Sequence, residues 1–348
     1  MRNDHEHLSR NEEIDLVEVF NGLWRQKLWI ALTTVVFTAV AVAYAYTAKP
    51  EYEAKVFVQP PTQNDISRLN YGRGGDTGLE MRSVRDVYEV FVTNLQSEYV
   101  RREFFRKFFL PSLPAEERGG SQDALYTGFT RALVVEPAGE GGRRFQIVVR
   151  QSDPGQAAQW AVRYAEMVSE RTKLDVTKDA KADATVKANN LEQRISAARE
   201  SARRQRDDQI AQLTEALKVA RSVGLEKPPI ISNTLSGEVS AGMDGSLAYM
   251  RGSRALEAEL DNLRNRSSDD PFIRDLRERQ EAVTFYRTLQ IFPTEIEVYR
   301  QDGAIEAPDR PIAPRKAMIV VLGVLAGVFF GALLALGRHF WLLRRKTG

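Results

Sequence analysis

Two long apolar runs lie near the two ends of the chain, and the sequence between them is largely polar. Residues 28–48 and 317–337 each contain about 21 residues without a charge, enough helix to cross the roughly 30 Å hydrocarbon core of a bilayer. We therefore predict two transmembrane helices. For the first run the alternative is a cleaved signal peptide, with Ala43-Tyr44-Ala45 as the cleavage site. A retained span is favoured, because about 27 residues rich in acids precede the run.

The second apolar run contains three glycines spaced four residues apart. Gly323, Gly327 and Gly331 share one face of the predicted helix. Without side chains, that face lets a second helix approach closely, as in packed membrane helices. The sequence thus predicts an anchor that is also a packing surface, but it leaves the partner helix open.

The chain enters this second run through a proline-rich segment that ends in two basic residues. Proline cannot continue a helix from the preceding domain, so the segment is expected to be extended as it reaches the bilayer. The basic pair then lies at headgroup level. The residues of this membrane-approach motif are Pro308, Pro311, Pro314, Arg315 and Lys316.

Two spans place both chain ends on the same side of the membrane. Arg25 and Lys27 flank the first span and a basic cluster follows the second, and positive flanks stay cytoplasmic. Arg315 and Lys316 weaken this asymmetry, but charge counts matter little for a long translocated domain. The predicted segments are 1–27 and 338–348 in the cytoplasm, 28–48 and 317–337 in the membrane, and 49–316 in the periplasm of a Gram-negative inner membrane.

Before the first span, apolar residues follow a roughly helical spacing. We interpret them as an interfacial helix that leads into the bilayer, and a simple extension of the membrane helix is the alternative. The residues are Ile14, Leu16, Val17, Phe20 and Leu23.

Residues 49–153 and 291–316 carry the patterns of a small α/β base next to the membrane. Residues 52–58 alternate between apolar and polar as a strand does, and residues 83–109 follow the period of one or two helices. The remaining predicted elements are strands at 131–136 and 144–150 around a glycine-rich turn at 139–142, and a strand near 295–299 that returns to the same sheet.

A polar stretch with four glycines, at residues 72–78, is predicted to be a surface loop. Such glycines could cradle a phosphate, but no strand-turn-helix context supports that function.

Residues 154–290 have the pattern of a long helical arm. Asp153-Pro154 is a helix start, with an acid at the N-cap and proline at the first helical position. After Gly155 no glycine or proline occurs until Gly224, so one helix over about 156–222 would run roughly 100 Å. After a tip at 224–245, two descending helices are expected at 245–265 and 271–290, with Ser268 to Asp270 as caps and Pro271 as a first helical residue.

The apolar stripe of the long helix is thin and cannot pack into one globular core. It needs a neighbouring helix, either in this chain or in another copy. A charged segment at 203–209 interrupts it. We interpret this segment as a solvated face, and contact with a polysaccharide or partner through Arg203, Arg204 and Arg206 is the alternative.

Composition narrows the function classes. The 49 basic and 47 acidic residues leave a net charge of +2, which does not indicate a nucleic-acid groove. Cysteine is absent and none of the three histidines lies between Ala48 and Lys316. This excludes triad catalysis and HExxH zinc sites there, and no phosphate-loop motif is present. We predict no enzyme, no cofactor and no metal.

In order and spacing, these features resemble the Wzz family of chain-length determinants, the polysaccharide co-polymerases. The resemblance lies in Asp15-Leu16 and Leu23-Trp24-Arg25-Gln26-Lys27 before the first span, in Asp269-Asp270-Pro271-Phe272, and in the proline-rich approach to the glycine-containing span.

The resemblance implies an α+β membrane protein with an α/β base and an arm of roughly 100 Å, in closed homo-oligomers of about eight copies. It also implies non-enzymatic control of the modal length of O-antigen in lipopolysaccharide. The implied partners are the Wzy polymerase and undecaprenyl-linked polysaccharide. Enterobacterial common antigen is the alternative polysaccharide.

Two other function classes fit the sequence less well. A sensor should carry a large cytoplasmic output module, and a periplasmic adaptor usually has one anchor and a lipoyl-like domain; neither pattern is present. A glycan-cleaving enzyme could use Asp269 and Asp270 as paired carboxylates, but adjacent acids before a helix proline are more simply capping groups.

Overall fold

The computed structural model describes residues 24, 26–139, 143–229, 245 and 247–347. Three sequence predictions therefore lie outside the described residues: the helix at 14–23, the centre of the glycine-rich turn at 140–142, and most of the tip loop. The chain divides into two compact units, and each is described by itself. The first contains residues up to 61, 88–171 and those from 299 on; the second contains 62–87 and 172–298.

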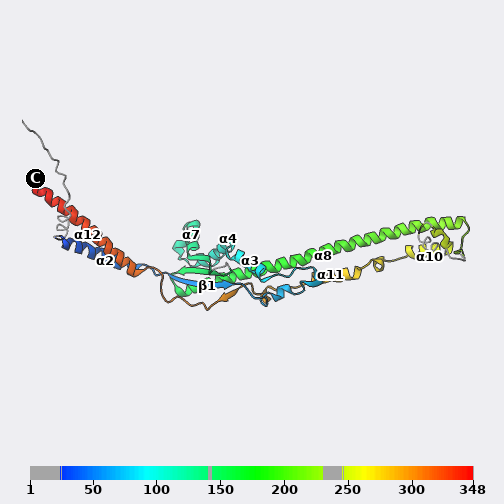
Figure 1. Cartoon of the computed structure of the whole chain (residues 1–348), viewed down its shortest axis with the longest axis horizontal. Helices are drawn as coiled ribbons and strands as arrows, with labels where there is room; N and C mark the ends of the chain where they lie inside the picture. The colour runs from blue at the N-terminus through cyan, green and yellow to red at the C-terminus, as the bar shows by residue number, and fades with distance from the viewer. Residues whose placement is uncertain (1–23, 25, 140–142, 230–244, 246, 348) are drawn as a thin grey trace, which may run out of the picture. The chain divides into compact units, whose positions relative to one another are not determined.

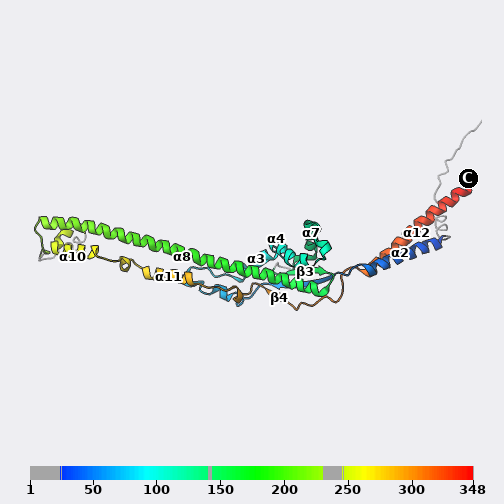
Figure 2. The ribbon, with the colours of Figure 1, turned by 180° about the vertical axis from the view of Figure 1, so that it is seen from behind.

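The first unit contains both apolar helices, α2 (Lys27–Thr47) and α12 (Lys316–Thr347). Within the described residues, the stretches long and apolar enough to cross a membrane are Lys27–Thr47 and Lys316–Arg338, by length and composition. The two helices lie side by side in both views (Figures 1 and 2).

A four-stranded antiparallel sheet forms the base of the first unit, in the order β2-β3-β1-β4. Its inner face is apolar because Ala54 and Val56 of β1 lie opposite Val149 and Ile147 of β3, and all four are buried. The strands are β1 (Tyr52–Gln59), β2 (Leu133–Pro137), β3 (Phe145–Gln151) and β4 (Arg300–Asp302).

Short helices rich in aromatic residues pack beside the sheet. Phe129 is fully buried among Phe104, Phe105 and Phe109, with ring centroids 5.2 to 6.1 Å apart. The helices are α3 (Val84–Leu95), α4 (Glu98–Phe104), the π-helical turn η3 (Phe105–Phe109), α5 (Leu110–Ser112), α6 (Ala115–Arg118) and α7 (Gln122–Ala132). Phe104, Phe105, Phe109 and Phe129 thus form part of the core of the first unit.

Two strand predictions need correction. The strand expected at 131–136 begins at Leu133, because the preceding residues end α7. The returning strand lies at Arg300–Asp302 and not at 295–299. Ile296 and Val298 are buried and alternate as in a strand, but the backbone N–H of Glu297 donates to the Asp65 carbonyl and not to β1.

The long helix predicted from the absence of glycine and proline is confirmed as α8 (Pro154–Ser222). Its 69 residues correspond to roughly 100 Å of continuous helix. The Asp153 carboxylate accepts a hydrogen bond of 2.8 Å from the Gln156 backbone N–H, so it caps the helix as the sequence indicated.

In the second unit, shorter elements return along α8, as both views show (Figures 1 and 2). They are the turn η4 (Ala248–Arg251), α10 (Ser253–Arg264), the turn η5 (Asp270–Phe272) and α11 (Leu276–Thr288). The descending helices are thus shorter than predicted. Pro271 lies in the 3-10 turn η5, and α11 begins only after Asp275, whose φ of 58° is incompatible with a continuous helix.

The apolar stripe of α8 is covered within this chain along much of its length. Leu213 and Leu217 pack with Leu256, Leu260 and Leu263 of α10. Nearer the start of the second unit, Ala184 and Ala188 pack with Leu79 and Tyr286. Of the two kinds of neighbour that the sequence left open, the structure shows the intrachain one.

Candidate functional site

The three glycines of α12 face α2 of the same chain. A Cβ atom built at Gly327 would lie 2.6 Å from Thr34 Cα, and one at Gly323 would lie 2.5 Å from Ala41 Cβ. At Gly331 the same atom would overlap Thr33 Oγ1 and lie 3.0 Å from Ile30 Cα. Only glycine therefore fits this helix contact without displacing the backbones.

A hydrogen bond and three ring contacts fix the register of the two helices. Thr33 Oγ1 donates to the Gly327 carbonyl at 3.3 Å, in the middle of the apolar segment. The Phe37 and Phe330 rings stack with their centroids 5.4 Å apart. Two cation–π contacts also join the helices: Lys316 Nζ lies 4.6 Å from the centroid of the Tyr46 ring, and Arg338 Cζ lies 4.9 Å from that of Trp29. The last two contacts lie at opposite ends of the apolar stretch Lys316–Arg338, so cations and rings stabilise the helix pair at both ends of that stretch.

The membrane-approach motif is tied to the segment that leaves α2. The Glu51 backbone N–H donates to the Ala313 carbonyl at 2.9 Å, and the Ile312 N–H donates to the Glu51 carbonyl at 2.8 Å. Pro314 and Arg315 follow directly, and α12 begins at Lys316. The two chain segments next to the apolar helices are thus joined to each other before the sheet begins at Tyr52. Pro308 and Pro311 precede this bridge in a stretch without helix or strand.

The three arginines in the charged segment of α8 at 203–209 differ in their contacts. Arg203 and Arg204 are exposed, and within the described residues each pairs with Glu200 of the same helix alone, at 3.8 and 3.1 Å. Arg206 instead reaches Asp269, with 3.0 Å between Nη1 and Oδ2. The solvated-face interpretation therefore describes Arg203 and Arg204 but is wrong for Arg206.

Arg199, about two helical turns before Arg206, binds the next acid in the returning segment. Its Nε and Nη2 donate to the two carboxylate oxygens of Asp270 at 2.9 and 2.7 Å. The hydrogen bonds from Arg199 lower the pKa of the Asp270 carboxylate. Asp269 is also approached by Arg266, at 3.5 Å. Both adjacent acids are thus bound by arginines. The Asp270 backbone N–H donates to Ser268 Oγ at 3.2 Å, but this contact lies at the turn η5 and does not cap the start of a helix at Pro271 as predicted.

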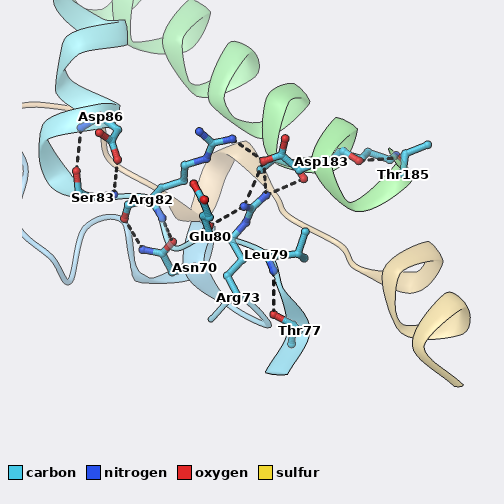
Figure 3. A network of polar contacts seen from close by, with 12 residues as sticks. Asn70, Arg73, Thr77, Leu79, Glu80, Arg82, Ser83, Asp86, Asp183 and Thr185 are labelled. Carbon is cyan, nitrogen blue, oxygen red and sulfur yellow. Dashed lines mark hydrogen bonds and ion pairs between the residues drawn. The ribbon is translucent and has the colours of Figure 1, made fainter. Parts of the chain in front are cut away.

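The sequence interpretation missed a buried arginine in the glycine-containing loop. The Arg73 side chain is 0% exposed, and its guanidinium donates to the carbonyls of Glu80 and Ala180 at 2.9 and 2.8 Å. Figure 3 shows Arg73 and Arg82 pointing at the same carboxylate, Asp183 of α8. Burial lowers the pKa of Arg73, and the Asp183 charge opposes that shift.

This loop is therefore not simply a surface loop. Leu79 lies in the cluster with Ala184 and Ala188, and the Tyr286 hydroxyl donates to the Thr77 carbonyl. Gly72, at φ 72°, has the Phe285 ring so close that a Cβ would lie 2.9 Å from it. Residues 70–82 thus join α8 to α11. The sequence signal was weak, because Tyr71, Leu79 and Met81 are the few apolar residues in an otherwise polar stretch.

Among the described residues, no group of three or more His, Asp or Glu side chains is placed to hold a metal ion. The arrangement instead offers two packed apolar helices and an arm held by ion pairs.

Comparison with known proteins agrees with this architecture. A family model described as Wzz, chain length determinant protein, matches residues 12–108. A chain length determinant protein of Escherichia coli O111:H- is 25% identical over 335 residues, which cover 94% of this chain and 92% of that protein. An ECA polysaccharide chain length modulation protein of Escherichia coli (strain K12) is 23% identical, over 94% of this chain and 95% of that protein.

A solved structure of a full-length bacterial polysaccharide co-polymerase has the same fold. The TM-score is 0.68 at 22% sequence identity, and the match covers 95% of this chain and 99% of that one. The chain is thus similar to chain length determinant proteins over nearly its full length, and it shares the fold of a polysaccharide co-polymerase.

Proposed function

We propose that this protein sets the modal length of a surface polysaccharide as a non-enzymatic co-polymerase of the inner membrane. The observation that carries the proposal is the similarity to chain length determinant proteins over 94% of the chain. O-antigen of lipopolysaccharide is the polysaccharide we propose first. The similarity to an ECA polysaccharide chain length modulation protein supports enterobacterial common antigen as the second candidate.

The proposed arrangement has α2 and α12 in the inner membrane, both termini in the cytoplasm, and residues 49–316 in the periplasm. The length and composition of the two helices support this arrangement. The packed glycine face and the Glu51–Ala313 bridge make the two spans one anchor. Membrane helices without a hydrophobic driving force need such close contacts to associate.

The protein acts, in this proposal, through assembly and contact with the Wzy polymerase and its undecaprenyl-linked product. Closed homo-oligomers, with about eight copies implied by the family resemblance, would bury surfaces without open ends. The stripe of α8 does not by itself demand another copy, because α10 and the 70–82 loop cover much of it. Exposed apolar side chains in the second unit support the oligomer instead: Tyr71, Met81, Val186, Phe272 and Phe292.

Catalysis by the adjacent carboxylates is disfavoured by their contacts. Arg199 holds Asp270 through both oxygens, and Asp269 is held by Arg206 and Arg266. Glycoside hydrolysis needs one carboxyl group to keep a proton near neutral pH, whereas Arg199 lowers the pKa of Asp270. The acids therefore serve to fix the returning segment on α8.

Gene deletion tests the proposal. Lipopolysaccharide from the deletion strain is resolved on a gel beside that of the parent and of a strain with the gene restored. We expect a clustered ladder in the parent, an unclustered ladder in the deletion, and clustering on restoration. Unchanged O-antigen combined with altered enterobacterial common antigen would transfer the function to that polymer. Unchanged length of both polymers would contradict the proposal.

The oligomer is tested separately. The full chain is extracted, placed in lipid nanodiscs, and its mass measured. A single species of several copies supports the closed assembly and gives the copy number. A monomer at every protein concentration would contradict it.

A further inference from the structure

A cleft of about 860 Å³ lies in the second unit, between the last third of α8 and the segment that begins the return. Its walls come from residues 209–219 of α8, from the turn η4, and from Glu259 of α10. None of the ion pairs that hold Asp269 and Asp270 lines this cleft. It is therefore separate from the ion pairs that bind Asp269 and Asp270 to α8.

One wall of the cleft is a row of polar side chains with planar groups. Gln209, Gln212 and Glu215 follow each other at intervals of three residues, so they lie along neighbouring positions of one side of α8. All three are exposed, and none makes a hydrogen bond or ion pair with any residue that the structure describes. The two amide groups can donate hydrogen bonds to a ligand in the cleft and accept them from it, and the Glu215 carboxylate can accept them.

The opposite wall supplies an aromatic ring and a cation. Tyr249 packs against the leucine cluster of α8 and α10, which fixes its ring at the edge of the cleft. Arg251 lies beside it and pairs with Glu259. Leu213, Ala216 and Val219 add apolar side chains to the lining of the cleft.

The charges of the cleft select against a polyanion. Glu215 and Glu259 carry two negative charges and Arg251 carries one positive charge, which leaves the described lining net negative. A phosphate-rich polymer would be repelled. A hydroxyl-rich ligand with little charge fits better, because hydroxyl groups pair with amides and carboxylates while the faces of sugar rings are apolar and pack on an aromatic ring.

We propose that this cleft binds a short segment of the polysaccharide chain. The inference rests on the proposed function for the identity of the polymer, and on the lining of the cleft for the site. Gln209, Gln212 and Glu215 bind the sugar hydroxyls, and Tyr249 packs against a ring face. Because the cleft is open to solvent, the affinity of one copy is weak, and several copies of the chain would bind one polymer more tightly.

The test uses the full chain in nanodiscs and, as probe, the soluble polysaccharide released by mild acid from the lipopolysaccharide of the parent strain. Binding is measured by saturation-transfer NMR and by titration calorimetry, with dextran as an unrelated polymer. The blocking variant is Ala211→Trp, which fills the cleft from an exposed lining position. Ala197→Trp is the matched control, since Ala197 is exposed on the same helix and does not line the cleft. Gln209→Ala with Gln212→Ala is a second variant that removes only hydrogen-bonding groups.

We expect wild type and Ala197→Trp to bind the released polysaccharide alike and more tightly than dextran. The double glutamine variant should bind about tenfold more weakly, as loss of two hydrogen bonds predicts, and Ala211→Trp should bind weaker still. Equal binding by Ala211→Trp and wild type would overturn the site. No binding by a wild-type protein that still restores a clustered ladder would overturn this inference and leave the proposed function intact. Binding at the cleft by a wild-type protein whose gene does not restore clustering would support the site and contradict the proposed function.

Discussion

Arg206 of α8 and Asp269 of the returning segment form an ion pair, with 3.0 Å between Nη1 and Oδ2. The pair occupies the apolar stripe of α8 between Ala202 and Ile210, and the side chains are 21% and 11% exposed. This ion pair explains why Arg206 lies on a stripe that otherwise consists of alanine, leucine and isoleucine. At this level of α8 the returning chain is not helical, and it places Asp269 against the stripe.

Replacing Arg206 by alanine should destabilise the second unit. Asp269 would lose its nearest cation while staying mostly buried, which costs about 1–3 kcal/mol. The free energy of unfolding, from urea titration followed by circular dichroism, measures the effect. Arg203→Ala is the matched control, because Arg203 is exposed and its change should stay within about 0.5 kcal/mol. Equal losses in both variants would show that the ion pair is unimportant.

The Arg199–Asp270 pair should make stability depend on pH in the acid range. Arg199 lowers the folded-state pKa of Asp270 below its usual 3.8, so the folded chain favours the ionised carboxylate. Its contribution is fully present above the unfolded pKa and is lost as pH falls through the folded pKa. Asp270→Asn should therefore unfold at a lower temperature than wild type from pH 5 to 8, and the difference should shrink below about pH 4. A gap that stays constant down to pH 3 would argue against this linkage.

Leucine at Gly323 and Gly327 together should separate α12 from α2. Each new side chain would meet α2 at Ala41 or Thr34, where no space is available. We expect an altered O-antigen ladder and a lower melting temperature in nanodiscs. Gly337→Leu is the control on the same helix, since a Cβ there has nothing within 4 Å. If the double variant, expressed at the normal level, gives the parental ladder, the glycine contact has no role in length control.

Arg73→Ala should loosen residues 70–82 from α8. It would leave the Glu80 and Ala180 carbonyls without their buried donor, at about 2–4 kcal/mol. Hydrogen exchange of this loop and of α11 should accelerate. Arg73→Lys should not restore protection, because an ammonium group cannot bind two carbonyls and Asp183 in a planar fork. Arg68→Ala, at an exposed residue with only a 3.8 Å pair to Glu295, should leave exchange unchanged.

Local sequence patterns determined the elements that depend on local physics. The uncharged runs specify the two apolar helices, and the absence of glycine and proline from 156 to 223 specifies α8. Alternation specifies β1, and Asp153 with Pro154 specifies where α8 begins. These features need only the period of an element and the chemistry of its ends, which neighbouring residues supply.

Only the tertiary structure decided which distant segments meet. Arg206, Arg203 and Arg204 look alike in sequence, yet one faces Asp269 and two face solvent, because the returning chain passes one side of α8. Arg73 is buried because Asp183 and a helix carbonyl are brought to it from about 110 positions away. Ile296 and Val298 are buried but do not join the sheet, because the backbone N–H of Glu297 between them donates to the Asp65 carbonyl. Pairing of this kind depends on the path of the whole chain, and no local period encodes it.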